Sequence, residues 1–89
     1  MKYKVDYVRI RENYITLNGW VVGKKPTSQP SFHVYNSKME SVEFKYVKTR
    51  RDDVCQVYFG KIYDEAYGFD IKFDYKRGED YYLEIKVDN

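Results

Sequence analysis

The chain has 89 residues, and its 16 basic and 14 acidic side chains give a formal net charge of +2. This length allows one domain, and so small a charge gives no argument for a nucleic-acid partner. The chain carries 11 Tyr, 5 Phe and 1 Trp, and Val and Ile outnumber Leu and Ala. Because β-branched and aromatic residues suit strands, the composition excludes a helical bundle and predicts a small all-β domain.

Cysteine content and hydropathy narrow the class further. Cys55 is the only cysteine, so neither an intramolecular disulfide nor a cysteine-based zinc site can form. Residues 1–14 lack the apolar segment of a signal peptide, and no apolar run is long enough to span a membrane. We therefore expect a cytoplasmic protein with no membrane span and no cofactor.

Alternation of apolar and polar residues predicts six strands separated by polar turns. In the first strand, which ends near Ile10, Tyr3, Val5 and Tyr7 share the apolar phase. The phase then changes to Val8 and Ile10, which predicts a β-bulge near Tyr7–Val8. The apolar positions of the other five strands lie within residues 15–21, 32–34, 42–47, 69–73 and 81–87. Both prolines fall in the connection 23–30, which excludes a central strand there.

Residues 51–60 break the alternation with apolar residues at helical spacing. Asp53, followed three residues later by Gln56, resembles a capping box, and Gly60 suits a left-handed helix end. This segment is predicted to form one or two helical turns that cross between two sheets.

These phases divide the aromatic residues into two groups. Six face the core: Phe32, Phe44, Tyr46, Phe69, Phe73 and Tyr81. Four face outward and are the candidate ligand-binding residues: Trp20, Tyr14, Tyr35 and Tyr82. Flat rings on a rigid sheet can stack on sugar rings. The alternative is that Tyr is a common strand former that covers cross-strand neighbours, and that Trp20 is buried beneath the connection 23–30.

No catalytic group is predicted. His33 is the sole histidine and faces outward in its strand, and no pattern places Cys55 beside it to be activated. One histidine, one cysteine and no calcium-type carboxylate cluster predict no metal site.

A basic segment around Tyr46 is the only hint of a nucleic-acid contact. It comprises Lys45, Lys48, Arg50 and Arg51, and basic groups beside aromatic rings can follow a single strand. Asp52 and Asp53 follow at once and cancel two charges. We therefore expect solvated strand ends and no nucleic-acid partner.

Three motifs in order resemble one family. They are Ile15-x-Leu17-x-Gly19-Trp20-Val21, Arg51-x-Asp53-Val54 with Phe59 after it, and Gly68-Phe69-x-Ile71. Together they resemble the accessory immunoglobulin-like β-sandwich domain appended to bacterial family 2 glycosyltransferases. The matching residues expected to hold the fold are Gly19, Arg51, Asp53, Val54, Phe59, Gly68 and Phe69.

The resemblance implies an antiparallel immunoglobulin-like β-sandwich of six or seven strands with one short helical crossover. It also implies a non-catalytic accessory domain in polysaccharide biosynthesis. Such a domain assists glycan (acceptor) binding or positions the catalytic domain, so its partners are an adjacent glycosyltransferase domain and a cell-surface glycan. The alternative is a protein–protein interaction or spacer module with no carbohydrate affinity. The first expected strand follows Met1 directly and residues 88–89 follow the last, so residues 1–89 are expected to be a single, excised N-terminal module.

Coplanar exposed rings in a shallow groove would favour glycan binding. An apolar patch or a free edge strand would favour the interaction module.

Overall fold

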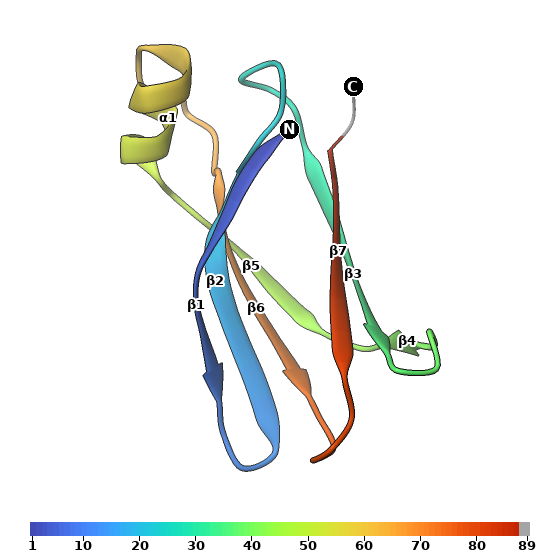
Figure 1. Cartoon of the computed structure of the whole chain (residues 1–89). Coiled ribbons are helices and arrows are strands. Elements are labelled where there is room, and N and C mark those ends of the chain that lie inside the picture. The colour runs from blue at the N-terminus through green and yellow to red at the C-terminus, as the bar shows by residue number, and fades with distance from the viewer. Residues whose placement is uncertain (88–89) are drawn as a thin grey trace.

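The structure, a computed structural model, describes residues 1–87, so residues 88–89 lie outside the described residues. Within that range the chain forms two antiparallel sheets and one helix (Figure 1). The elements are β1 (Lys2–Ile10), β2 (Tyr14–Val22), β3 (Pro30–Asn36), β4 (Ser41–Val42), β5 (Lys45–Thr49), α1 (Asp52–Phe59), β6 (Gly68–Asp74) and β7 (Tyr81–Val87). The four-stranded sheet has the order β1-β2-β6-β5, and the three-stranded sheet has the order β4-β3-β7.

The main core lies between the two sheets. Its buried side chains are Val21, Val34, Phe69, Ile71 and Phe73. All six aromatic residues predicted to face inward belong to this core or pack against it, which confirms the phases read from the alternation. Burial of apolar surface between two facing sheets is the main favourable term for such a fold.

The predicted strand at residues 42–47 is in fact two strands in different sheets. β4 pairs with β3 in one sheet, whereas β5 pairs with β6 in the other. Val42, Phe44 and Tyr46 nevertheless all pack against the core. Alternation reports which face a side chain takes but not which strand the backbone pairs with, so this crossing between the sheets had no trace in the pattern.

The helix is present, but two predictions about it are wrong. α1 connects β5 to β6, which are neighbours in the four-stranded sheet, so it does not cross between the sheets. The capping box is absent: Arg51 occupies the N-cap position without a side-chain cap, and Gln56 donates to the Gly60 carbonyl at 3.0 Å instead. The predicted end is confirmed, because Gly60 has φ 75° and its amide donates to the Gln56 carbonyl.

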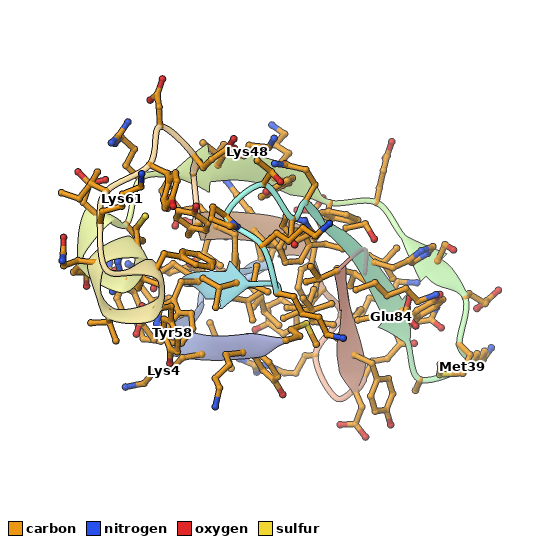
Figure 2. The ribbon with its side chains drawn as sticks, turned by 90° about the horizontal axis from the view of Figure 1, so that it is seen from above. Lys4, Met39, Lys48, Tyr58, Lys61 and Glu84 are labelled. Atoms are coloured by element: carbon orange, nitrogen blue, oxygen red, sulfur yellow. The ribbon has the colours of Figure 1, made fainter. Side chains whose placement is uncertain are left out.

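α1 covers a second, smaller core on the outer side of the four-stranded sheet. Figure 2, seen from above, shows α1 on the side of that sheet away from β3 and β7. Val22, Val54, Cys55 and Tyr67 are buried there. This packing stabilises a helix that is too short to be stable alone. Among the described residues, no helix has the length and apolar character needed to cross a membrane.

Substitution of Gly19 tests whether β1 and β2 require a residue without a side chain at their close approach. A Cβ at this position would collide with the Lys4 carbonyl oxygen and lie 3.0 Å from the Phe69 ring. We expect Gly19→Ala to lower the free energy of unfolding by about 1–3 kcal/mol, measured by urea or thermal denaturation. Gly78→Asn is the control, since Gly78 has no atom within 4 Å of its would-be Cβ and Asn tolerates positive φ. Equal effects of the two variants would contradict the steric account.

Tyr67 gives a pH-dependent test of the second core. Its hydroxyl donates to the Pro26 carbonyl at 2.8 Å, and burial raises the pKa of Tyr67 to about 12. A pKa raised above the unfolded value of about 10 contributes stability that is complete below pH 10 and lost as the pH rises toward 12. We expect Tyr67→Phe to cost about 1–2 kcal/mol at pH 7 and to show a shallower loss above pH 10. Parallel stability profiles of the two proteins above pH 10 would contradict this.

Candidate functional site

The four predicted ligand-binding rings lie on two opposite faces of the molecule. Tyr14 and Trp20 are on the outer face of the four-stranded sheet, because their neighbours Ile15 and Val21 face the core. Tyr35 and Tyr82 are register partners on the outer face of the three-stranded sheet. The four rings therefore cannot form one platform for a ligand.

The Trp20 ring packs against other side chains of the protein. Its ring lies 5.3 Å from that of Tyr58, which projects from α1 toward β1 and β2 in Figure 2, and it packs against the second core. The residue is half-buried. The element that covers it is α1, not the connection 23–30.

Tyr14 and Tyr35 also have neighbours on a ring face. The Lys72 ammonium lies 4.2 Å from the Tyr14 ring centroid, and the His33 ring stacks on Tyr35 at 4.2 Å with an interplanar angle of 3°. Of the four predicted rings, only Tyr82 is exposed, at 50%. These four residues therefore do not form a flat platform of two or three exposed rings.

His33 and Cys55 have separate partners. The His33 Nε2 atom lies 2.7 Å from the Ser41 hydroxyl on the outer side of the three-stranded sheet. Cys55 belongs to α1 and is fully buried, and its thiol contacts the Lys61 carbonyl and the Tyr63 amide. Among residues 1–87, no three His, Cys, Asp or Glu side chains are grouped to hold a metal ion.

Five of the seven motif residues meet at one junction, whereas Val54 and Phe59 pack in or against the second core. Gly19 and Phe69 are register partners in β2 and β6. A Cβ on Gly68 would lie 2.8 Å from the Cγ atom of Arg51 and would collide with Thr49. The small residue therefore gives the arginine stem its path across the sheet.

Arg51 connects this junction to both β1 and α1. Its Nη1 atom donates to Asp6 at 2.7 Å, and its Nε and Nη2 atoms donate to the two carboxylate oxygens of Asp53 at 3.1 and 3.0 Å. The bidentate pairing fixes the guanidinium plane. Hydrogen bonds from Arg51 lower the pKa of Asp53, and hydrogen bonds to Asp53 and Asp6 raise the pKa of Arg51.

Asp6 is the bulge residue of β1. The register passes from Val5 opposite Gly19 directly to Tyr7 opposite Asn18, so Asp6 has no partner in β2. The predicted bulge near Tyr7–Val8 is thus confirmed. The bulge falls before Tyr7, so Tyr7 lies on the outer face and the core phase predicted for it is wrong.

The outer face of the four-stranded sheet is hollowed beside this bulge. Two adjoining hollows, of about 420 and 400 Å³, share Tyr7, Asn18 and Asp70. We call their union the outer-face hollow. Its other lining residues include Asp6, Arg9, Thr16, Lys45, Val47, Thr49, Arg50, Arg51 and Lys72. The hollow thus crosses all four strands and carries one exposed ring among hydrogen-bonding groups.

Comparisons with protein-family models, with curated proteins and with solved structures found no match for this chain.

The adjacent arginines test the Arg51 junction. Arg51 is 30% exposed and joins β1 to α1, whereas Arg50 is 52% exposed and pairs with Asp52 and Asp64 outside the sheet. We expect Arg51→Ala to lower the free energy of unfolding by about 1–2 kcal/mol and Arg50→Ala to lower it much less, because exposed ion pairs contribute little. Both are measured by urea denaturation.

The pH dependence gives an independent readout of that junction. Because Arg51 lowers the pKa of Asp53 in the folded protein, this contribution is complete above the ordinary value of about 4 and lost as the pH falls through the lowered value. The stability difference between wild type and Arg51→Ala should therefore shrink in acid. A difference that is constant down to pH 2, or an equal loss in Arg50→Ala, would contradict the role of Arg51.

Proposed function

We propose that this chain is a non-catalytic, immunoglobulin-like accessory domain that binds a glycan in the outer-face hollow. The observation that carries the proposal is the exposed Tyr7 ring beside Asn18 and Asp70, in a hollow that crosses four rigid strands. In the glycosyltransferase-type protein implied by the motifs, the domain would present the glycan to a neighbouring catalytic domain.

The chemistry of the hollow suits a sugar. Tyr7 is 50% exposed although the Arg9 guanidinium lies 5.2 Å from its ring centroid, so ring surface remains for the apolar face of a pyranose. The Asn18 amide both donates and accepts hydrogen bonds, and the Asp70 carboxylate accepts them from hydroxyl groups. An open hollow of about 400 Å³ is within the size range of small-ligand sites, and its course across the strands suits an extended chain.

The arrangement of the fold supports the architectural part of the proposal. A four-stranded and a three-stranded antiparallel sheet that enclose one core have the strand numbers of a constant-type immunoglobulin sandwich. The motif residues Gly19, Gly68 and Arg51 meet at the edge of the hollow. Their role in shaping it is consistent with an accessory domain in which they hold the fold.

A second candidate function, docking to a neighbouring protein domain, is favoured by the core side of β1. Tyr3, Val8 and Ile10 lie on that side, opposite Val21, Leu17 and Ile15 of β2, yet they are 56%, 49% and 66% exposed. β1 is also an edge strand, whose outer backbone groups are open to pairing. The exposed apolar residues on this edge thus fit an adjoining domain that covers them.

Two tyrosines of equal exposure provide a matched test of the glycan site. Tyr7 lies in the outer-face hollow, and Tyr82 lies on the opposite face at the same 50% exposure. We expect amide shifts around Tyr7, Asn18 and Asp70 when ¹⁵N-labelled protein is titrated with a panel of bacterial cell-wall oligosaccharides. Tyr7→Ala should weaken binding about 5- to 10-fold, and Tyr82→Ala should not change it.

The outcomes separate the candidates. Shifts confined to the Tyr82 face would move the site to the three-stranded sheet and contradict the proposal. No shift with any oligosaccharide would contradict glycan binding and favour the docking function of β1.

A further inference from the structure

Three cations form one row across the outer-face hollow. In the register, Arg9 lies opposite Thr16, Thr16 opposite Lys72, and Lys72 opposite Lys45. We call Arg9, Lys72 and Lys45 the cation row. It comes from β1, β6 and β5, and the threonine hydroxyl fills the place between the first two cations.

None of the three forms an ion pair with a carboxylate among residues 1–87. The Arg9 guanidinium lies 5.2 Å from the Tyr7 ring centroid, and the Lys72 ammonium lies on Tyr14. Lys45 faces Lys72 directly, and like charges opposite each other on adjacent strands destabilise a sheet.

Two other cations that line the hollow do have carboxylate partners. Arg50 and Arg51, at the other end of the hollow, each pair with two aspartates. Asp70 and Asp74 flank Lys72 on the same face of β6, but neither is within ion-pair distance of the row. The row therefore presents positive charge to solvent that an anionic ligand could neutralise.

We propose that the outer-face hollow binds an acidic oligosaccharide, whose sugar units carry carboxylate or phosphate groups. This inference depends on the proposed function and names the substrate class of that same site. The acidic group lies over Lys45 and Lys72 with Arg9 beside it, and each cation donates charge-assisted hydrogen bonds to it. The sugar hydroxyls lie over the next row, at Asn18 and Asp70.

The neighbouring row favours an acidic sugar over a nucleic acid or a free phosphate. Successive outward rows are two residues apart, about 6–7 Å along the strand, so Asp70 is one sugar length from the cations. A carboxylate there accepts hydroxyl hydrogen bonds but repels a second anionic group. A ligand that places hydroxyls beside its acid satisfies both rows. A free phosphate fills only one of them, and a continuous phosphate backbone brings charge to both.

The test compares five probes by calorimetry with the 89-residue protein: a galacturonic acid hexasaccharide, a phosphorylated maltohexaose, neutral maltohexaose, hexathymidylate and inorganic phosphate. We expect at least one acidic probe to bind about 10-fold more tightly than the neutral one. That preference should fall several-fold between about 50 and 200 mM NaCl, because salt screens exposed charges.

The variants are Lys45→Gln and Lys72→Gln, with Lys38→Gln as the matched control. Lys38 is an exposed lysine in the turn between β3 and β4. Each row variant should weaken acidic-probe binding about 5-fold and flatten its salt dependence, and the control should change neither. Lys45→Gln should leave the melting temperature unchanged or raise it, since it removes a like-charge pair. If Lys45 had only a structural role, Lys45→Gln would instead lower the melting temperature and leave acidic-probe binding unchanged.

Each other outcome overturns a defined part of the argument. Equal binding of neutral and acidic probes overturns the acidic specificity and leaves glycan binding intact. Equal or tighter binding of a hexathymidylate overturns it in favour of nucleic acid, and saturation by inorganic phosphate alone overturns the oligosaccharide. No binding of any sugar overturns the proposed function together with this inference.

Discussion

The Arg51 guanidinium joins parts of the chain that are 45 residues apart, and the geometry of the candidate site depends on this contact. It binds Asp6, the residue that β1 leaves unpaired, and Asp53 in the first turn of α1. A bulge residue has no ladder partner to hold it, and α1 has no side-chain cap. The Arg51 guanidinium thus holds both the bulge of β1 and the first turn of α1. Gly68 is part of the same constraint, because its missing side chain leaves room for the arginine stem.

The bulge and the helix then divide the outer face of the four-stranded sheet. The extra residue in β1 turns Tyr7 and Arg9 outward while Val8 turns toward the core side. At the other end of the face, α1 covers Trp20 with Tyr58. Trp20, which was predicted to bind a ligand, is therefore packed against the helix. The exposed ring on this face is that of Tyr7, which the alternation had assigned to the core.

Sequence reasoning succeeded where one physical variable decided the outcome. Alternation predicts a face, and the six aromatic residues from Phe32 to Tyr81 that were assigned to the core pack in or against it. It could not predict partners: the chain from Val42 to Tyr46 keeps its face but changes sheets. The local sequence allows the Asp53 carboxylate to accept hydrogen bonds from a helix amide or from Arg51. The path of the Arg51 side chain past Gly68, which no local pattern predicts, decides for Arg51. The predicted core position of Tyr7 is wrong because the bulge at Asp6 reverses the sheet face of the residues that follow it.

Local rules fail in two places, and both involve β1. On its outer face, Arg9 begins a row of cations in which Lys45 and Lys72, of like charge, are direct register partners. On its core side, Tyr3, Val8 and Ile10 remain exposed because the three-stranded sheet does not cover them. Natural proteins depart from local consistency mainly where function requires it. One edge strand therefore presents unneutralised charge on one face and unburied apolar surface on the other, which suits a domain that holds an acidic ligand while it contacts a neighbour.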